Sequence, residues 1–574
     1  MPNKNNILYS NDKPFESPIK IVGAYLWDKL NKLSDDLVCL IDARTDERLT
    51  IGELKTRANN VSMALIGQGV TKGDRIAFSG QNSIQHAILR FSAKLLGLTF
   101  MPLSPTFESY EVQQEVQSAG TNIIVTSSED YRKFQRVFDD NTSNRNPVVK
   151  LVVVFDGELQ SRQQQHQDIK HIIYGQLLVE GSSGQQLPQI PYYEVNTDTD
   201  PLFLIHTSGS TGRPKCAMIP HRTFIGAAQE TTFFLSLHNN NNNDNNNNNT
   251  AAKNKQTVCA MPYPCGHISG TCMIPLQLIS GAQLVIMGEF DEDLLFRSIE
   301  KYRIQILPAF PSFGRRLIEG DSAQLYDLSS LQLMSTGGAA FPGHIAQQII
   351  DKYGIKFKEA YGMTEFLWVS TGSKINDKFE SGNVGQVAPG CELKICDLST
   401  GQPLCPNQDG EICIRGNKLF MGYLDSDDRI NREAIDEDGW YRTGDIGHYD
   451  QRERLFITDR LKEVVRIGID NHYINMSPVE IEMFVLTHPA VSEVAVVGVN
   501  NSAGTHWPRA YVVRKPGHTV TGDDIVKFVA DMLAYTKQLK AGVVFVDTIN
   551  RTSIGKVDRK YYRNLVKNEI FDYK

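Results

Sequence analysis

Short apolar runs alternate with amphipathic segments through the first 460 or so residues of this chain. The run Leu202–Ile205 has the length of a buried strand, whereas Glu53–Leu65 and Ile84–Leu96 place apolar residues three and four positions apart, as one face of a helix does. Such alternation favours βαβ units and largely parallel sheets. The other expected strands are Arg75–Phe78, Asn122–Val125, Val148–Phe155, Gln283–Met287, Ile304–Leu307, Leu331–Met334 and Ile355–Phe357.

The pattern changes near residue 460, after Asp459-Arg460-Leu461-Lys462. A chain of 574 residues exceeds one typical domain of about 100–200 residues. We expect a large domain at residues 1–458 and a small α+β domain at residues 463–574, joined by residues 459–462. The small domain contains an expected helix at Asp523–Leu533 and expected strands at Val491–Val499, Ala510–Val513 and Val543–Val546.

Charge and hydropathy exclude several classes of protein. Hydrophobic residues make up 41% of the chain, as in soluble globular proteins. The net charge of −7 disfavours a nucleic-acid binder, which normally carries a basic domain. Because no apolar run approaches about 18 residues, we expect no transmembrane segment.

Three features favour the cytoplasm. Residues 1–6 are polar and lack the apolar core of a secretory signal, and residues 571–574 are not the Ser-Lys-Leu peroxisomal address. The nine cysteines form no Cys-x-x-Cys pair, so neither a zinc site nor a disulfide framework is indicated. We therefore expect reduced thiols and a cytoplasmic protein.

Two segments have the composition of insertions. Residues 156–190 are polar and rich in Gln, which favours a surface excursion. Residues 239–249 are Asn except for Asp244, a low-complexity tract that we expect to be a disordered, exposed loop. Loop closure entropy grows slowly with length, so such an insertion costs little stability.

A hydroxyl-rich and glycine-rich loop follows the expected strand Leu202–Ile205. It reads His-Thr-Ser-Gly-Ser-Thr-Gly-Arg-Pro-Lys at residues 206–215. Glycine lets backbone N–H groups turn toward a ligand, hydroxyls donate further hydrogen bonds, and Lys215 adds a positive charge. These groups suit a polyphosphate, although the spacing is not that of the common nucleotide loop, in which Gly-Lys-Ser/Thr ends the motif.

Together with this loop, further motifs extend over nearly the whole chain in a fixed order. In that combination the chain resembles the adenylate-forming enzymes, which include acyl-CoA synthetases, 4-coumarate–CoA ligases, beetle luciferases and peptide-synthetase adenylation domains. The motifs are TSGSTGRPK at 207–215, PCGHISG at 264–270, STGGAA at 335–340, AYGMTE at 360–365, GEICIRG at 410–416, GWYRTGD at 439–445, DRLKE at 459–463 and SIGK at 553–556.

The resemblance implies a fold and a reaction. The implied fold is α/β, with mostly parallel sheets flanked by helices in the large domain and a small, mobile α+β C-terminal domain. The implied reaction joins a small-molecule carboxylic acid to ATP, releasing pyrophosphate, and CoA then displaces AMP from the acyl-adenylate. ATP and Mg²⁺ are the implied cofactors and CoA is a co-substrate. The pattern carries no information about the oligomeric state.

The resemblance also implies a nucleotide site at the carboxyl end of the expected strand Ile355–Phe357, where open α/β sheets place ligands. Tyr361 would stack on adenine, Thr364 would contact a phosphate oxygen and Glu365 would help to hold Mg²⁺, for which a carboxylate is a suitable ligand. Asp445 would accept the ribose hydroxyls. The remaining implied nucleotide-binding residues are Thr207, Ser208, Gly209, Ser210, Thr211, Gly212, Lys215, Gly337, Gly338, Ala339, Gly362, Met363 and Arg460.

Three residues match catalytic positions of the family. Lys556 matches the lysine of adenylation, a cation that would offset the repulsion between the carboxylate and the α-phosphate. His267 matches the histidine that borders the carboxylate. Lys462 lies in the family's hinge at 459–462, about which rotation would exchange Lys556 for another face of the small domain.

The acid itself is not named by the sequence. The side chains expected to line its pocket are small or apolar, which suits an aryl or fatty acyl group better than an amino acid. They are those of His267, Ser269, Met273, Phe366 and Leu367, beside Gly337, Gly338 and Ala339.

The chain departs from the family pattern at three places. Cys216 and Ala360 replace glycines, which we expect to change only loop packing. Residues 466–475 are several residues longer than the loop that relatives use at the thioester stage. Adenylation is therefore better supported than transfer to CoA.

We retain three alternatives to an acid–CoA ligase. The first is adenylation without CoA transfer. A stand-alone adenylation domain that serves a carrier protein is the disfavoured form of this alternative, because no carrier segment follows residue 565. The second, a luciferase-like monooxygenase, is disfavoured by Ala227, where beetle luciferases tend to hold arginine. The third is a non-catalytic adenylate-binding protein, against which Lys215, Glu365, Asp445 and Lys556 argue.

Overall fold

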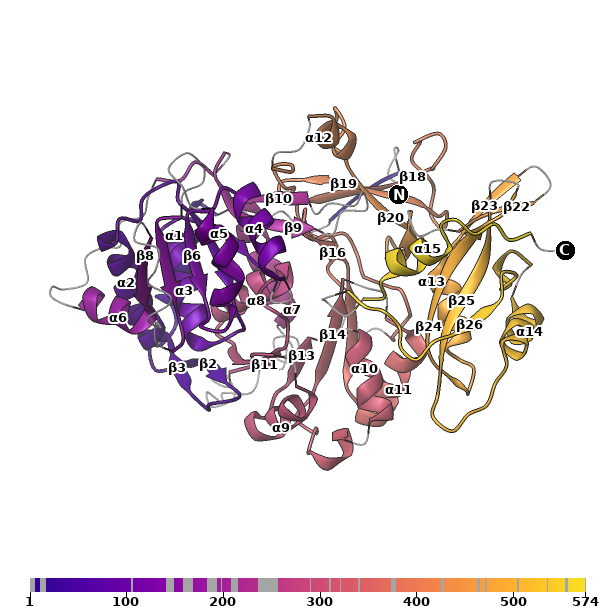
Figure 1. The fold of residues 1–574 in the computed structure, drawn as a ribbon, viewed down its shortest axis with the longest axis horizontal. Helices are drawn as coiled ribbons and strands as arrows, with labels where there is room; N and C mark the ends of the chain where they lie inside the picture. The colour runs from indigo at the N-terminus through magenta and orange to yellow at the C-terminus, as the bar shows by residue number, and fades with distance from the viewer. Residues whose placement is uncertain are drawn as a thin grey trace, which may run out of the picture.

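The fold consists of two α/β layers, an antiparallel sheet and a C-terminal domain (Figure 1). The computed structural model describes residues 6–10, 17–104, 107–140, 149–157, 169–182, 194–197, 199–207, 215–235, 256–289, 291–308, 311–320, 322–338, 341–372, 378–424, 428–461, 465–469, 472–502, 505–533, 535–552 and 556–572.

The first sheet has seven strands. Its neighbouring strands are parallel except for the antiparallel pair at one edge, β10 with β9. In spatial order they are β10 (Lys215–Pro220), β9 (Pro201–Thr207), β5 (Thr99–Pro102), β4 (Arg75–Ser79), β6 (Ile123–Thr126), β7 (Leu151–Val154) and β8 (Lys170–Ile173).

The second sheet also has seven strands, and only its edge pair β2–β3 is antiparallel. In spatial order they are β15 (Lys356–Ala360), β14 (Leu333–Gly337), β13 (Ile306–Pro308), β11 (Val258–Met261), β12 (Gln283–Ile286), β2 (Val38–Asp42) and β3 (Arg48–Thr50). The expectation of mostly parallel sheets is therefore confirmed for these two layers.

The third sheet is antiparallel, which the sequence pattern did not predict. Its order is β1 (Ile7–Tyr9), β18 (Cys391–Cys396), β19 (Gly410–Gly416), β20 (Tyr441–Tyr449) and β21 (Leu455–Arg460). A small hairpin, β16 (Gly362–Met363) with β17 (Leu367–Trp368), follows β15.

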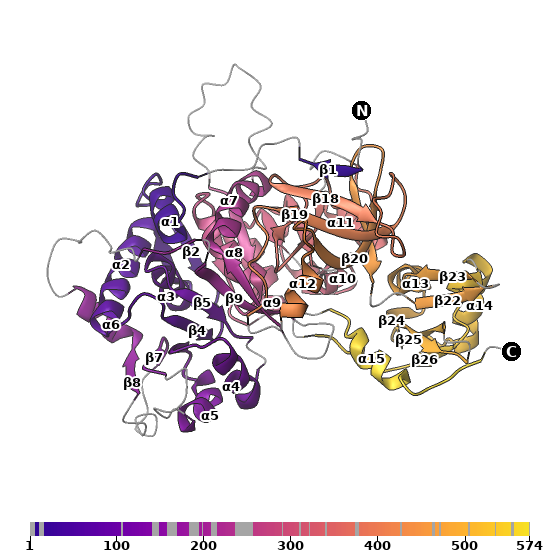
Figure 2. The same ribbon diagram turned by 90° about the horizontal axis from the view of Figure 1, so that it is seen from above.

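Helices cover the two parallel sheets (Figure 2). None of those in the described part of the chain combines the length and the apolar character that crossing a membrane requires. The large domain's α-helices are α1 (Val22–Leu30), α2 (Ile51–Gly67), α3 (Ile84–Leu95), α4 (Ser109–Ser118), α5 (Gln135–Asp139), α6 (Tyr174–Ser182), α7 (His221–Leu235), α8 (Ile268–Leu278), α9 (Glu292–Tyr302), α10 (Pro311–Glu319), α11 (Gly343–Tyr353) and α12 (Asp428–Ala434), with 3-10 turns at Asp130–Phe134 and Ser322–Leu325.

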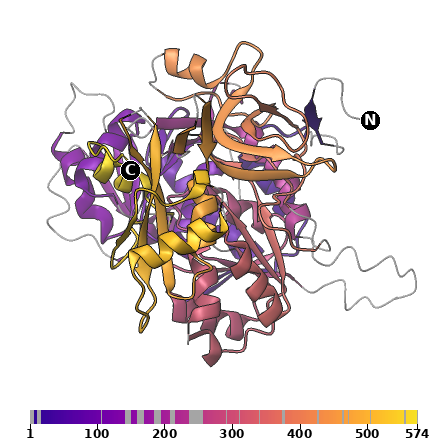
Figure 3. The ribbon, with the colours of Figure 1, turned by 90° about the vertical axis from the view of Figure 1, so that its right-hand side faces the viewer.

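The C-terminal domain lies in front of the rest of the molecule in Figure 3. Strand β24 (Val491–Asn500) pairs antiparallel with β25 (His506–Arg514), which pairs parallel with β26 (Val543–Phe545). The hairpin β22 (Val465–Ile469) with β23 (His472–Met476) precedes this sheet. Its helices are α13 (Pro478–Val485), α14 (Gly522–Met532) and α15 (Arg559–Val566), with a 3-10 turn at Tyr535–Lys537.

Local sequence signals explain where individual helices begin. Thr50 caps α2: its Oγ1 accepts from the Glu53 N–H at 3.2 Å, and its own N–H donates to Glu53 Oε2 at 2.9 Å. This reciprocal pair satisfies two N–H groups that a helix start otherwise leaves without partners.

The eight expected strands of the large domain are all present, with ends that differ by a few residues. Ile304–Leu307 is β13 at Ile306–Pro308, and Leu331–Met334 is β14 at Leu333–Gly337. These strands start later because the backbone N–H groups of the preceding residues are used in turns: the Ile304 N–H donates to the Ile299 carbonyl and the Leu331 N–H to the Leu328 carbonyl.

The prediction of a surface excursion at residues 156–190 was wrong for its central part. Lys170–Ile173 is the edge strand β8, and helix α6 follows it directly. Ile172 and Leu177 are buried against the first sheet and its helices, so a short apolar run between polar flanks forms structure there. The Asn-rich tract 239–249 lies outside the described residues.

Candidate active site

The carboxyl ends of β14 and β15 meet at one edge of the second sheet. Their last residues, Gly337 and Ala360, are direct partners in the ladder. Gly338 and Tyr361 therefore leave the sheet side by side, as expected for a ligand site on an open α/β sheet.

Glycine is required at this edge. A Cβ atom on Gly337 would lie 3.0 Å from the Ala360 carbonyl oxygen, and Gly338 has a φ of +78°, a conformation that strains residues with a side chain. The two glycines leave a flat backbone surface that a planar ring can approach.

Tyr361, Asp445 and Arg460 form a hydrogen-bonded group at the same edge. The Tyr361 hydroxyl donates to Asp445 Oδ2 at 2.6 Å, and Arg460 Nε lies 2.9 Å from Asp445 Oδ1. Asp445 on β20 and Arg460 on β21 are direct partners across the third sheet. Burial and the Asp445 charge raise the pKa of Tyr361 well above its ordinary value, so its hydroxyl stays protonated and donates.

This geometry adds to what the sequence predicts for Asp445. Both carboxylate oxygens already accept one protein donor each, and a carboxylate offers about four acceptor positions. A ligand hydroxyl would therefore share these oxygens with Tyr361 and Arg460, which orient the carboxylate before a ligand binds.

Glu365 forms a second group with Tyr423, which the sequence analysis missed. The Tyr423 hydroxyl donates to Glu365 Oε1 at 2.9 Å and lies 3.2 Å from the Tyr441 hydroxyl. Glu365 is 8% exposed; burial raises its pKa, and the hydrogen bond from Tyr423 opposes that rise.

Tyr423 also connects Glu365 with the hydroxyl-rich loop. The Lys215 ammonium lies 5.0 Å from the centre of the Tyr423 ring. The segment with Tyr423 runs beside β10, because the Leu424 N–H donates to the Cys216 carbonyl at 2.8 Å. Lys215 begins β10, so the start of the loop's return strand is held against the Glu365 group.

The Glu365 group suits Mg²⁺ bound together with a nucleotide. In the described residues no group of three or more His, Cys, Asp and Glu side chains could form a metal cage of its own. Mg²⁺ in nucleotide enzymes needs no such cage, since it is commonly bound by one or two carboxylates and by substrate phosphates. A single oriented carboxylate beside Lys215 fits that mode.

His267 caps α8. Its Nδ1 accepts the Ser269 N–H at 3.2 Å, so the neutral ring carries its proton on Nε2. Burial, and then the positive charge of Lys556, lower the pKa of His267 to about 4. The ring is therefore neutral near pH 7 and faces the surroundings of Lys556.

Lys556 reaches the large domain from the C-terminal domain. Its Nζ lies 3.9 Å from the position that a Cβ atom on Gly338 would occupy. The Lys556 carbonyl accepts the Thr552 N–H at 2.8 Å, and Arg551 pairs with Val557, so backbone contacts hold Lys556 in place shortly before α15. Figure 2 shows this segment reaching from the C-terminal domain toward the centre of the molecule.

The residues expected to line an acyl pocket are divided in the structure. Ser269 and Met273 lie on α8, one turn apart and next to His267. Phe366 is fully buried, with the Lys418 ammonium 5.1 Å from its ring centre, and Leu367 has a φ of +63°. The structure thus holds Phe366 in the core, while Leu367 takes a strained conformation in β17.

The other candidate residues are accounted for as follows. Thr207 ends β9, Gly362 and Met363 form β16, and Thr364 is half-buried in the turn before Glu365. Ser208, Gly209, Ser210, Thr211, Gly212, Ala339 and Lys462 lie outside the described residues.

The signal for Tyr423 in the sequence was weak. It follows Gly422 a few residues after the GEICIRG motif, and only the pairing of that segment with β10 brings it to Glu365. A contact between residues 58 positions apart in the chain is not visible from local periodicity.

Comparison with known proteins identifies relatives of this chain. The family of the AMP-binding enzyme matches residues 27–424, and that of the AMP-binding enzyme C-terminal domain matches residues 480–556. Among curated proteins, 4-coumarate-CoA ligase 1 of Narcissus pseudonarcissus is 30% identical over 546 residues, which cover 94% of this chain and 92% of the relative. Luciferin 4-monooxygenase of Photinus pyralis is 26% identical over 533 residues, which cover 92% of this chain and 91% of the relative.

A solved structure has the same fold over nearly the whole chain. ATP-bound MatB from Rhodopseudomonas palustris superimposes with a TM-score of 0.79 at 22% sequence identity, covering 96% of this chain and 99% of that one. This likeness extends to the large domain and the smaller C-terminal domain together.

Proposed function

The chain belongs to the AMP-binding enzyme family, and on that premise we propose that it is an ATP-dependent acid–CoA ligase. It would activate an aryl or fatty carboxylic acid as an acyl-adenylate and transfer the acyl group to CoA. The observation that carries this proposal is the position of Lys556, whose ammonium lies at the sheet edge beside Gly338 although it belongs to the other domain.

The first step would join two anions. The carboxylate attacks the α-phosphate of ATP, the P–O bond to pyrophosphate breaks, and acyl-AMP and pyrophosphate result. A cation between the two reactants offsets their repulsion and orients them, and Lys556 is suited to this role. His267 would border the carboxylate with its Nε2–H, since the ring is neutral near pH 7.

The remaining groups would hold the nucleotide. The polyphosphate would lie on the loop 207–215, with Lys215 as its cation. Glu365 would hold Mg²⁺, which supplies charge neutralisation to the phosphates when bound. The Gly337–Gly338 backbone and Tyr361 would flank the adenine, and Asp445 would accept ribose hydroxyls beside Arg460.

Transfer to CoA would be the second step. The CoA thiol attacks the acyl carbonyl, the bond to AMP breaks, and the proton of the thiol leaves with the phosphate or to solvent. Support for it comes from the 4-coumarate-CoA ligases among the relatives. Residues 466–475 form most of the hairpin β22–β23 and are longer than their counterpart in the family pattern. This difference makes the support for the transfer step weaker than that for adenylation.

Pyrophosphate release and thioester formation separate the two steps. The purified protein would be incubated with ATP, Mg²⁺ and a panel of aryl and fatty acids, with and without CoA. We expect acid-dependent pyrophosphate release and, with CoA, an acyl-CoA product. Acid-dependent release without any thioester would reduce the function to adenylation. Light or oxygen uptake would favour the monooxygenase, and ATP binding without release would favour a non-catalytic protein.

A further inference from the structure

Helix α3 has a polar stripe that is buried. His86, Arg90 and Lys94 recur every four residues, so they share one face of the helix. An amphipathic helix normally presents such a face to solvent. Here the three side chains are between 1% and 4% exposed. His86 stacks on Phe155, Arg90 and Lys94 lie over Phe100 of the first sheet, and α8 lies beside Arg90 and Lys94.

Within the described residues, Arg90 and Lys94 are basic groups that have no counter-charge when they are protonated. Burial, and then the charge of Arg90, lower the pKa of Lys94 well below its ordinary value. Within the described part of the chain, neither Nη atom of Arg90 has a hydrogen-bond acceptor. The Lys94 ammonium donates to the Arg90 carbonyl oxygen at 3.2 Å. A buried charge normally has an ionic partner, because leaving water costs far more than one neutral hydrogen bond returns.

Aromatic rings offset part of this cost. The Arg90 guanidinium and the Lys94 ammonium lie 4.9 Å and 4.7 Å from the centre of the Phe100 ring, and Lys94 lies 5.4 Å from that of Phe203. A single ring attracts a cation with a modest energy, and here two cations share one ring. The rings therefore leave most of the desolvation cost uncompensated.

The neighbouring thiols do not supply the missing negative charge. Burial raises the pKa of Cys272 to about 12, and it also raises the pKa of Cys265. The Cys265 Sγ donates its hydrogen to the Gly80 carbonyl at 2.8 Å. Both thiols are therefore protonated and neutral near pH 7.

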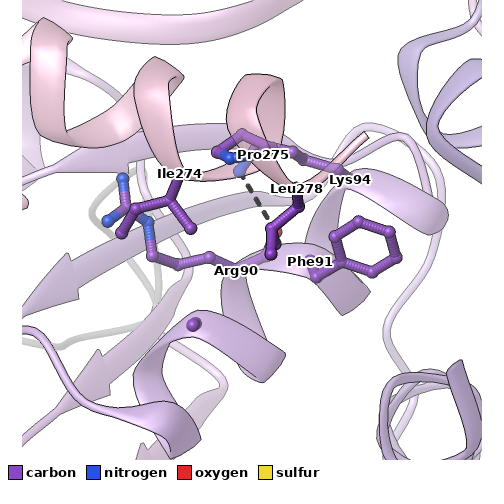
Figure 4. A pocket seen from close by; sticks show the side chains of 7 residues that line it. Arg90, Phe91, Lys94, Ile274, Pro275 and Leu278 are labelled. Carbon is purple, nitrogen blue, oxygen red and sulfur yellow. Dashed lines mark hydrogen bonds between the residues drawn. The ribbon is translucent and has the colours of Figure 1, made fainter. Parts of the chain in front are cut away.

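A small cavity adjoins the two cations. It has a volume of about 10 Å³, which is room for one small species the size of a water molecule. Figure 4 shows Arg90 and Lys94 between α3 and α8, with the hydrogen bond from Lys94 marked. The residues labelled around the cavity are Arg90, Phe91, Lys94, Ile274, Pro275 and Leu278.

We propose that Arg90 and Lys94 bind a monatomic anion of the halide class, chloride under ordinary conditions, in the cavity between α3 and α8. The Arg90 guanidinium, whose Nη atoms have no acceptor in the described residues, supplies the charge, and the Lys94 side chain supplies further N–H donors; the size of the cavity excludes phosphate, sulfate and carboxylates. The bound anion would join α3 to α8, the helix that His267 caps. This site is separate from the nucleotide and acyl sites, and its occupancy does not depend on the proposed ligase activity.

Crystals of the full-length protein soaked in bromide test occupancy directly, because bromide replaces chloride and is located by its anomalous signal. We expect a peak between α3 and α8 within hydrogen-bond distance of Arg90 or Lys94. A water molecule or no density there, with bromide found only on the surface, would overturn the proposal.

Thermal unfolding in solution gives a second readout. For wild type, replacing gluconate by about 0.2 M chloride at constant ionic strength should raise the apparent Tm by about 2 °C, if the dissociation constant is near 10 mM. Arg90→Met and Lys94→Met should lose this chloride response, whereas Lys72→Met, which changes an exposed lysine, should keep it.

The variants also carry a prediction that a merely structural role does not make. In gluconate, Arg90→Met should be at least as stable as wild type, because it removes a buried charge without a partner and keeps an apolar chain of similar length. A chloride response of the same size in wild type and in both buried-site variants would refute the site, even if the variants were destabilised.

Discussion

Replacement of Lys556 by alanine is the sharpest test of the proposed chemistry. The ammonium lies 3.9 Å from the position of a Cβ atom on Gly338, so a charged ligand atom lying against this glycine would be about 4 Å from Nζ. Two unit charges at about 4 Å interact by about 4 kcal/mol at an effective dielectric constant of about 20. Since about 1.4 kcal/mol corresponds to a factor of ten in rate, this is a factor of about 10³.

The two half-reactions should respond differently. Adenylate formation, measured as acid-dependent pyrophosphate release, should fall about 10²–10³-fold, the lower figure allowing for screening by solvent. Thioester formation from supplied acyl-adenylate and CoA should stay within a few-fold of wild type, because no anion–anion encounter remains. Lys560→Ala, an exposed lysine on α15, is the matched control and should change neither.

A titration gives a readout that is independent of turnover. The charge of Lys556 lowers the pKa of His267, so Lys556→Ala should raise that pKa above about 4, while burial, the larger cause, keeps it below the ordinary value. NMR of the imidazole resonances would follow this. Equal loss of both half-reactions, or an unchanged pKa of His267, would refute the reasoning.

Three further predictions concern other groups. Tyr423→Phe removes the donor to Glu365, so the pKa of Glu365 should rise further. ATP binding measured by calorimetry should then need several-fold more Mg²⁺, and the binding should recover toward higher pH. An unchanged Mg²⁺ requirement would contradict this. Tyr361→Phe removes a 2.6 Å hydrogen bond to a buried carboxylate, which should lower the free energy of unfolding by about 1–3 kcal/mol, measured with urea; an equal midpoint would contradict it. Burial raises the pKa of Glu359 from its ordinary 4.5 to about 7, so the native state holds a proton that the unfolded state loses, and stability should fall as pH rises from about 4.5 to 7. The excess stability of wild type over Glu359→Gln should therefore shrink across this range by up to about 3 kcal/mol, and a constant difference would show that Glu359 is not the group involved.

The sequence predicted the parts of the fold that local periodicity controls. The parallel strands and the helices of the large domain follow from the alternation of apolar runs and amphipathic segments. The antiparallel sheet does not, because β1 and β18 pair across most of the chain and only tertiary contact brings Ile7 opposite Lys394. The edge strand β8 was missed because its polar flanks dominate the composition around it.

Site residues that belong to a sequence motif could be predicted, whereas residues that only tertiary packing brings to the site could not. Lys556 and Gly338 come from motifs far apart in the sequence, and the structure brings them together. Tyr423 was missed because its contact with Glu365 depends on the segment beside β10. Arg90 and Lys94 have the spacing of a solvent-facing stripe, and only the packing of α3 against the first sheet and α8 makes them buried.

The ion pair between Asp445 and Arg460 lies at the end of β21, the last strand of the large domain. The family resemblance implies that the C-terminal domain turns about residues 459–462. In that case one end of the hinge is Arg460, which the neighbouring strand β20 holds through its backbone and through Asp445. The torsional freedom of the connection would then fall on the residues after Arg460, so the axis of rotation would keep a constant position relative to the carboxylate of Asp445. Shortening the Arg460 side chain would let that axis drift, and successive turnovers would return Lys556 to a less reproducible place.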